Sequence, residues 1–476
     1  RLGPEEVFRA VLSLHPNKAP SPDGLNAFFF RKAWAVVGPD VVDAILEFFR
    51  SGKLLPEANG PIISLIPKVS NACHLTDFRP ISCSNSIYKC ISKILAAILR
   101  LTLPSCINKA QSAFIQGRRI SDNILMAQEL MRGYHLDHGA PRCAFKVDLF
   151  KAFDSVIWEF LWDAFDLLGL PSRFSPWTKC CVSSAMYTVN INGSLHGYFP
   201  RKRGLKGTPS PPFLFVICME VFSHILDSLI SASSSFKYHW RCDKTFISHL
   251  CFADDLLLFS YGNLDFVLVL KQALDIFSSL SGLSVNFSKS LMFSTGISED
   301  VRISIEGAMG IRGGCLPLCY LGVPLITTRL RAADCAILEE KIIRRVKVWT
   351  NKFFSFVGRL QLVQSILFSM QAYWCYHFIL PKRVVRSIEA TLRSFLWKGP
   401  SLNVSGVKVA WDLVARTMEE GGLGVKCIQD WNMAAMARHA WDICNPAFSS
   451  VWVYWARIFL LGKSQFWVAK VPWNCS

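Results

Sequence analysis

The order of apolar and polar residues predicts a chain in which helices alternate with short strands. Residues 1–55 keep mostly helical spacing, interrupted at 17–24 by a turn that is rich in proline and ends in Asp-Gly. Residues 62–69 form a short apolar run typical of a strand. Residues 77–81 continue as a second extended piece, because a residue that precedes proline is pushed toward the β region. Residues 87–101 repeat apolar side chains every three or four positions, which predicts an amphipathic helix.

Two apolar strands in the middle of the chain end in carboxylates. Residues 144–147 are followed by Asp148, and residues 247–259 hold Asp254 and Asp255 between two apolar runs, which predicts a hairpin with both aspartates at its tip. Asp-Asp is a poor pair for a tight turn, since the favoured turns use Asn-Gly or Asp-Gly. A divalent cation would offset the repulsion between the two charges, because hard cations prefer carboxylate oxygens. An acidic turn facing water is the alternative for this stretch alone.

The remaining predicted elements follow from the same periodicities and from turn residues. In chain order they are a helix that Asp154 starts as its N-cap and that runs to residue 168, a hairpin at 188–199 with its turn at Asn192-Gly193, a helix at 213–230, a helix at 266–281, a strand at 283–293 and a short strand at 320–324.

Composition indicates a folded chain with a large core. The 476 residues are 51% hydrophobic and only 18% charged, so we expect more than one domain and no extensive disorder. No run approaches the ~20 apolar residues that a membrane span needs. The nearest candidate, 213–222, is short and is interrupted by Glu220, so we expect no membrane partner.

The charge balance favours a polyanion as partner. Lysine and arginine total 52 against 35 acidic residues, a net charge of +17. Residues 329–398 hold 13 basic and 4 acidic residues, a local +9. The 17 cysteines form no C-x-x-C pair, which predicts free thiols in a reducing, intracellular compartment. Cys73-His74 and Cys315 with Cys319 lack a second pair at zinc spacing, so a zinc site is disfavoured.

The three aspartates suit a specific chemistry if their strands are neighbours in one antiparallel sheet. Asp148, Asp254 and Asp255 would then converge at one edge and could hold two divalent ions roughly 3.5–4 Å apart, as in polymerases, nucleases and phosphatases. One ion would activate an attacking hydroxyl, and the other would neutralise a leaving pyrophosphate.

At this point the chain resembles a known family. Residues 145–154, which read FKVDLFKAFD, and residues 252–255, which read FADD, resemble motifs A and C of reverse transcriptases, with the closest likeness to LINE-type, non-LTR retrotransposons of plants. Five further segments agree in order and spacing: 65–68, 77–82, 111–118, 282–290 and 320–324.

The resemblance implies an α+β right-hand polymerase with fingers, a palm containing an antiparallel sheet, and a helical thumb. It implies an RNA-directed DNA polymerase that extends a DNA primer on an RNA template with deoxynucleoside triphosphates, in the nucleus. We expect an N-terminal helical extension at 1–58, fingers and palm at 59–325, a basic thumb at 326–400 and a tryptophan-rich region at 401–476, ending before a complete zinc-binding segment.

The family's functional residues map onto this chain position by position. Asp148, Asp254 and Asp255, with the Leu149 carbonyl, match the ligands of two Mg²⁺ ions, for which Mn²⁺ is a substitute. Lys68 and Arg79 match finger residues that grip the incoming triphosphate, a role suited to cationic donors; ordinary solvated strand charges are the alternative. Phe153 matches the side chain that excludes a ribose 2′-hydroxyl, or is a core aromatic. Lys289 matches the lysine that protonates pyrophosphate, or is a surface lysine. Tyr320, Leu321 and Gly322 match the primer-grip strand, or a plain core strand.

One motif departs from the family pattern. Motif B in the family runs Arg-Gly-Leu-Arg/Lys-Gln-Gly-Asp-Pro-Leu-Ser-Pro, whereas residues 203–212 read RGLKGTPSPP and lack the glutamine between Lys206 and Gly207. In the family this loop supports the nascent base pair, so the deletion predicts impaired synthesis. A catalytically degenerate RNA-binding or maturase-type protein is therefore the alternative. An RNA-dependent RNA polymerase is disfavoured, because that group usually carries Gly-Asp-Asp.

The C-terminal third has the pattern expected of a thumb. An apolar stripe at helical spacing comprises Leu338, Ile342, Val346, Trp349 and Phe353, and basic residues beside it comprise Lys341, Arg344, Arg345 and Lys352. These cations would contact phosphates without reading sequence. Seven tryptophans follow, at 374, 397, 411, 431, 441, 452 and 455, and we expect core packing for most of them rather than base stacking.

Overall fold

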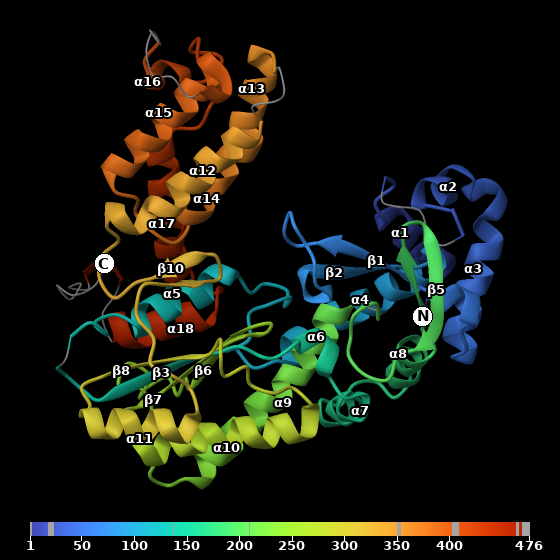
Figure 1. The fold of residues 1–476 in the computed structure, drawn as a ribbon, viewed down its shortest axis with the longest axis horizontal. Helices are drawn as coiled ribbons and strands as arrows, with labels where there is room; N and C mark the ends of the chain where they lie inside the picture. Colours follow the sequence, from blue (N-terminus) through green and yellow to red (C-terminus); the bar gives the residue numbers. More distant parts are fainter. Residues whose placement is uncertain are drawn as a thin grey trace.

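The computed structural model describes residues 2–17, 23–136, 138–208, 210–349, 354–401, 409–462 and 466–468. The fold is α+β, as predicted, with two four-stranded sheets and a small two-stranded one. Figure 1 shows the first sheet among the N-terminal helices, the second between two helical layers, and a helical lobe standing above the second sheet. We call these parts the fingers, the palm and the thumb.

The fingers are built from the N-terminal helices and a sheet of strand order β2-β1-β4-β5. Their elements are α1 (Pro4–Ser13), α2 (Ala27–Lys32), α3 (Trp34–Ser51), β1 (Ile62–Pro67), β2 (Phe78–Cys83), α4 (Ser86–Cys106), α8 (Phe174–Ser183), β4 (Met186–Ile191) and β5 (Ser194–Pro200). The predicted helices and the predicted hairpin are confirmed. Asn192 and Gly193 have φ of 51° and 88°, as a type I′ turn requires. Residues 18–22 of the predicted N-terminal turn lie outside the described residues.

The palm sheet has the strand order β6-β7-β3-β8, and all of its neighbours run antiparallel. Palm elements are α5 (Ile120–Leu130), β3 (Arg142–Val147), α6 (Ala152–Ser155), α7 (Trp158–Leu167), α9 (Pro211–Ala232), β6 (His249–Phe252), β7 (Asp255–Tyr261), α10 (Leu264–Ser281), β8 (Leu291–Thr295), α11 (Glu299–Met309), β9 (Leu318–Tyr320) and β10 (Val323–Leu325). Helices α9, α10 and α11 cover one face of the sheet, and α5 and α18 (Val451–Ala456) lie over the other (Figure 1).

Strand alternation explains why both faces are covered. Phe145 and Leu256 point into the core shared with α9 and α10, whereas Ala144 and Leu257 point into the core shared with α5 and the thumb. A sheet that is apolar on both faces must be covered on both.

Helix α9 corrects one prediction about length. It runs for 22 residues and is, by length and composition, apolar enough to cross a membrane, so the expectation of a run too short for that is wrong. In the structure α9 is a core helix: 67% of its most apolar window is buried, and Glu220 within it is 3% exposed.

Two predicted strands are wrong in extent. Of the predicted 283–293 strand only residues 291–293 are regular, at the start of β8 (Leu291–Thr295), and Val285 makes an isolated bridge to Leu149 instead. The predicted strand at 320–324 is a hairpin, β9 and β10, whose turn residues Leu321 and Gly322 have φ of 48° and 86°.

The thumb and the C-terminal segment share one apolar core with the upper face of the palm. Their helices are α12 (Ala336–Val348), α13 (Phe356–Leu362), α14 (Phe368–Cys375), α15 (Lys382–Lys398), α16 (Trp411–Val414), α17 (Ile428–Cys444) and α18 (Val451–Ala456). The predicted stripe on α12 is buried at Leu338, Ile342 and Val346, and Phe353 and Lys352 lie outside the described residues. Core packing of the tryptophans is confirmed for most of them; Trp441 is 69% exposed.

Candidate active site

Strand pairing places the predicted carboxylates at one end of the palm sheet. In the antiparallel pair β3–β7, Val147 lies opposite Leu256, so the next step of the register sets Asp148 beside Asp255. Both follow the face of the sheet that carries Ala144 and Leu257, because side chains alternate along a strand. The structure thus brings motif A and motif C together, as the sequence predicts.

The β6–β7 hairpin presents its aspartates differently from the prediction. Phe252 pairs with Asp255, so the two turn residues are Ala253 and Asp254, and Asp255 is the first residue of β7. Ala253 has a φ of 54°, a left-handed conformation that costs a residue with a Cβ about 1–2 kcal/mol. Asp254 is exposed at the tip, whereas Asp255 is half-buried.

A buried glutamine holds this strained turn. Gln111 is 1% exposed, and its Oε1 accepts from the backbone N–H of Ala253 at 3.2 Å and of Ala113 at 2.9 Å. The loop around Gln111 also pairs with β6, since Ala110 accepts from Cys251 N–H at 2.9 Å and Ser112 N–H donates to the Cys251 carbonyl at 3.0 Å. No local pattern in the sequence indicates this role of Gln111, although the residue lies in one of the segments that resemble the family.

Asp148 is oriented by the segment that was predicted as a strand. Asn286 Nδ2 donates to Asp148 Oδ2 at 3.1 Å, and the Asp148 backbone N–H donates to Ser290 Oγ at 3.1 Å. Lys289 lies between these two partners and is exposed, so the structure places it in the loop that holds Asp148. Asn286 is a second residue whose role the sequence analysis missed.

Electrostatics links the three carboxylates. The pKa of Asp255 is raised, first by burial and then by the negative charges of Asp254 and Asp148, while Lys146 acts in the opposite direction. Burial, the largest cause, disfavours the charged form of this carboxyl. A bound cation would act in the opposite direction and favour the charged form.

The donors fit Mg²⁺ as a partial ligand set. Among the described residues, no three His, Cys, Asp or Glu side chains form a closed metal cluster. Mg²⁺ is typically held by one or two carboxylates together with waters and substrate phosphates, so an incomplete protein set suits it. The Leu149 bridge to Val285 uses the Asp148 carbonyl and the Phe150 N–H, and leaves the Leu149 carbonyl outside that pairing.

The predicted substrate residues of the fingers lie on one hairpin. Arg79 on β2 pairs opposite Ile66 on β1, and Lys68 follows β1; both cationic side chains are exposed. Lys68 Nζ donates to the Thr76 carbonyl at 2.7 Å. Their predicted contact with a triphosphate stays a prediction.

Asp154 is not the N-cap that the sequence predicted. It lies inside the short helix α6, and its carboxylate makes ion pairs with Arg201 at 3.3 Å and with Lys206. The prediction failed because these partners lie far along the chain, in the strand-to-loop segment that leads into motif B. Asp154 therefore fastens motif A to motif B.

The described start of the motif B loop is anchored to the segment that follows motif A, despite the missing residue. Leu205 N–H donates to the Phe153 carbonyl at 2.7 Å, and Gly204 N–H donates to the Val156 carbonyl at 2.7 Å. Gly207 has a φ of 76°, and a Cβ there would lie 2.9 Å from the Tyr187 hydroxyl, so only glycine fits.

Phe153 has two predicted roles, exclusion of a ribose 2′-hydroxyl and packing in the core, and its position combines a core contact with partial exposure. Its ring is 4.6 Å from that of Phe215 on α9 and is only partly buried. The ring thus packs on the core through Phe215 and is partly exposed.

The predicted primer grip lies beside the carboxylates. Tyr320 is 1% exposed, and its pKa is raised by burial and then by the charge of Asp255. The tip is held from the thumb, because the Tyr373 hydroxyl donates to the Leu321 carbonyl at 2.6 Å. Gly322 completes the tip with its positive φ.

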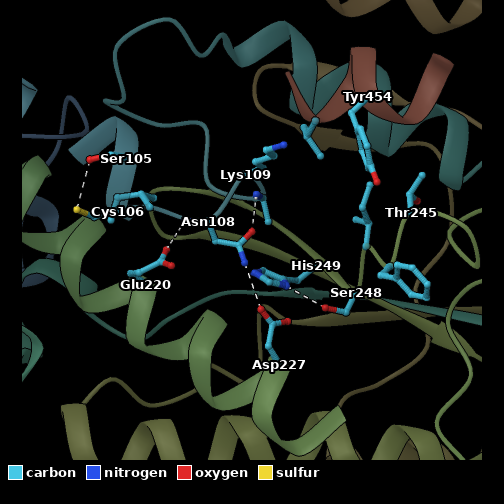
Figure 2. Close-up of a pocket in the computed structure, with 15 residues that line it drawn as sticks. Ser105, Cys106, Asn108, Lys109, Glu220, Asp227, Thr245, Ser248, His249 and Tyr454 are labelled. Atoms are coloured by element: carbon cyan, nitrogen blue, oxygen red, sulfur yellow. Dashed lines mark hydrogen bonds between the residues drawn. The ribbon is translucent and has the colours of Figure 1, made fainter. Parts of the chain in front are cut away.

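A cavity of about 420 Å³ lies between α9, the loop at 105–110 and the start of β6 (Figure 2). Glu220 on α9 projects into it and accepts from the Asn108 N–H at 2.8 Å, while Asn108 Nδ2 donates to Asp227 at 3.3 Å. Burial raises the pKa of Glu220 to about 7. This polar wall supports the loop at 108–112 that carries Gln111.

Comparisons with known proteins agree with this site. Residues 66–325, just over half of the chain, match the family described as reverse transcriptase (RNA-dependent DNA polymerase). The chain is 26% identical over 429 residues to the transposon TX1 uncharacterized 149 kDa protein of Xenopus laevis, covering 89% of this chain and 32% of that protein. It is 28% identical over 284 residues to the retrovirus-related Pol polyprotein from type-2 retrotransposable element R2DM of Drosophila melanogaster, covering 59% and 25%. The chain thus spans about a third or less of these relatives.

Solved structures give weaker likenesses. Telomerase from Candida albicans, in complex with a fragment of telomeric RNA, has a TM-score of 0.45 and 10% identity, covering 87% of this chain and 64% of that one. Apo telomerase from Candida tropicalis has a TM-score of 0.39 and 12% identity, covering 59% of each chain. Scores below 0.5 do not by themselves establish a shared fold. The family match extends over more than half of the chain, and the protein therefore belongs to the reverse transcriptase (RNA-dependent DNA polymerase) family.

Proposed function

We propose that this chain is the polymerase region of a LINE-type, non-LTR retrotransposon protein. It would extend a DNA primer on an RNA template with deoxynucleoside triphosphates. The observation that carries the proposal is the β3–β7 register, which sets Asp148 beside Asp255 with Asp254 at the adjoining turn. A plant origin is supported by the motif resemblance and by a 27% identical stretch of 130 residues in a putative ribonuclease H protein of Arabidopsis thaliana. A nuclear location stays a prediction.

In this proposal the carboxylates bind the metal ions, and the other residues position the carboxylates and the substrates. Asp148, Asp254 and Asp255, with the Leu149 carbonyl, would hold two Mg²⁺ ions. Bound there, the ions would activate the primer hydroxyl and neutralise the leaving pyrophosphate. Asn286 and Ser290 fix Asp148, and Gln111 fixes the turn that carries Asp254. Lys68 and Arg79 would bind the triphosphate, Lys289 would donate a proton to pyrophosphate, and Phe153 would press against the sugar where a 2′-hydroxyl would lie.

The motif B deletion favours a second candidate, a polymerase-like RNA-binding protein without turnover. The hydrogen bonds that tie down residues 204–208 support the first candidate, because they show a loop with defined anchors rather than a collapsed one. Intact carboxylates also support it. The two candidates differ in one measurable property, which is nucleotide incorporation.

RNA-templated primer extension with Mg²⁺ tests the proposal. The full chain should add deoxynucleotides, and Asp254→Asn should reduce incorporation to background while leaving binding of the primer–template in place. Asp300→Asn is a matched control, since Asp300 is an exposed aspartate in the first turn of α11. Template binding without incorporation by the unaltered chain would establish the second candidate.

A further inference from the structure

A cavity at the far end of the palm is lined by arginines. It measures about 670 Å³ and is formed by the loop after α5, by the segment after α9 and by the residues that follow β10. Its arginines are Arg132, Arg142, Arg241 and Arg329, and we call it the arginine pocket. Arg142 begins β3 and Asp148 follows its end, so about 20 Å of strand separates the pocket from the catalytic carboxylates.

Among the described residues that line the arginine pocket, there are four arginines and no carboxylate. Among the described residues, Glu129 is the carboxylate that pairs with these arginines, at 3.0 Å from Arg241 and 3.7 Å from Arg132. Arg142 is held by neutral groups instead: its Nη1 donates to the Ala140 carbonyl and its Nη2 to the Gly133 carbonyl, both at 2.9 Å. Within the described part of the chain, the four guanidinium groups of this pocket therefore outnumber the carboxylate that pairs with them, and a guanidinium group stays protonated in proteins.

The floor of the pocket also has unused hydrogen-bonding capacity. Arg142 is 5% exposed, and its Nε has no hydrogen-bond partner in the described part of the chain. Burial lowers the pKa of Arg142, which reflects the cost of keeping this charge away from water. Behind it, the pKa of His239 is lowered to about 3 by burial and by Arg142 and Arg241, so this imidazole stays neutral and adds no further charge.

The rim is open and suited to a larger ligand. His135, His138 and Arg329 are exposed, and Trp240 keeps 39% of its surface exposed. An indole at the edge of a cationic pocket can stack on a base, and stacking tolerates any base sequence. A cavity of several hundred Å³ exceeds what a lone small anion needs.

We propose that the arginine pocket binds a phosphate group, and that this phosphate belongs to a single-stranded RNA segment that runs past the palm outside the catalytic end. Guanidinium forks match phosphate geometry, and an anion would offset the buried charge of Arg142. The site adds to the proposed polymerase function a second anchor for RNA, on a part of the palm that makes no contribution to the metal site.

Binding of a labelled single-stranded RNA to Arg329→Ala tests the proposal, with the catalytic end already filled by a short primer–template duplex. We choose Arg329 because it is exposed at the rim, and because its removal leaves the hydrogen bonds of Arg142 to the Ala140 and Gly133 carbonyls in place. The slope of log K against log salt should fall by about 0.7 for the lost contact. Arg302→Ala, on the exposed side of α11, is the matched control and should leave the slope unchanged.

Two further arms make the result decisive. Titration with inorganic pyrophosphate, followed by calorimetry, distinguishes a free anion from an RNA phosphate as the ligand. If Arg329→Ala weakens pyrophosphate binding but leaves the salt slope of RNA binding unchanged, the pocket binds a free anion and the RNA assignment is overturned. Equal binding of both probes to Arg329→Ala and to the unaltered chain would overturn the phosphate site itself. Extension of the short duplex should be the same in both proteins, so failure of this inference is separable from failure of the polymerase proposal.

Discussion

Replacing Gln111 by methionine tests whether the Gln111 side chain fixes the conformation of the turn at Ala253 and Asp254. Methionine has a similar volume but no amide oxygen, so the backbone N–H groups of Ala253 and Ala113 lose their acceptor. A buried donor left without a partner costs about 1–3 kcal/mol, and the left-handed conformation of Ala253 holds about 1–2 kcal/mol of strain that the lost bond no longer opposes. The turn should therefore relax and move Asp254.

The expected effect is on turnover rather than on substrate affinity. A displacement of about 1 Å costs roughly 100-fold in rate, so kcat for primer extension at saturating nucleotide should fall by about that factor. KM for the nucleotide should change little, because the residues proposed to bind the triphosphate, Lys68 and Arg79, lie on the separate fingers hairpin. Gln371→Met is the matched control: Gln371 is likewise fully buried, but lies in α14 of the thumb.

Ala253→Gly in the Gln111→Met background distinguishes positioning from general destabilisation. Glycine adopts positive φ without strain, so the turn should keep its shape without Gln111 and recover about tenfold of the lost rate. Additive losses in the double variant, measured with the fold checked by circular dichroism, would refute the idea that Gln111 acts through the Ala253 turn.

Three further predictions concern other parts of the molecule. The pKa of Glu220 is about 7 in the folded chain against an ordinary 4.5, so between these pH values the folded chain holds a proton that the unfolded chain has lost. The free energy of unfolding should therefore fall as pH rises from about 4.5 to 7. Glu220→Gln should remove up to about 3 kcal/mol of this dependence, measured by urea titrations at the two pH values. Inserting glutamine between Lys206 and Gly207 should raise primer extension if the deletion impairs synthesis, whereas equal rates would show that the loop anchored at Leu205 has already adapted. Binding of RNA–DNA duplex should weaken steeply with salt through the cations of α12, and a flat response between low and moderate salt would contradict a basic thumb.

The cluster of three carboxylates was predictable because its signal in the sequence is local. Asp148 follows a strand, and Asp254 and Asp255 lie within a hairpin pattern, so the only long-range step was the pairing of β3 with β7. The resemblance in motif order supplied that step. Strand alternation then fixed which face the side chains follow.

The failures came where a residue's partner is distant in sequence. Asp154 has the local pattern of an N-cap, and no neighbouring residue in the sequence indicates its ion pairs with Arg201 and Lys206. Residues 283–290 have strand-like composition, but their backbone and side chains serve Asp148 through Asn286 instead of a ladder. Gln111 lies in a matched segment, yet its use as an acceptor for Ala253 depends on a tertiary contact that no periodicity encodes.

The path of the chain through the thumb has a mechanical consequence. The thumb leaves the palm after β10 and returns to it at α18, which packs on α5, while Arg119 at the start of α5 is ion-paired with Asp442 of α17. Trp455 Nε1 also donates to the Arg241 carbonyl at 2.8 Å. A lobe that is attached at one end can rotate about that end in several directions. A lobe that is attached at both ends can rotate only about the line that joins its two attachments. Motion of the thumb toward a bound duplex is therefore restricted to one axis, and cutting the chain before α18 would release it from that axis.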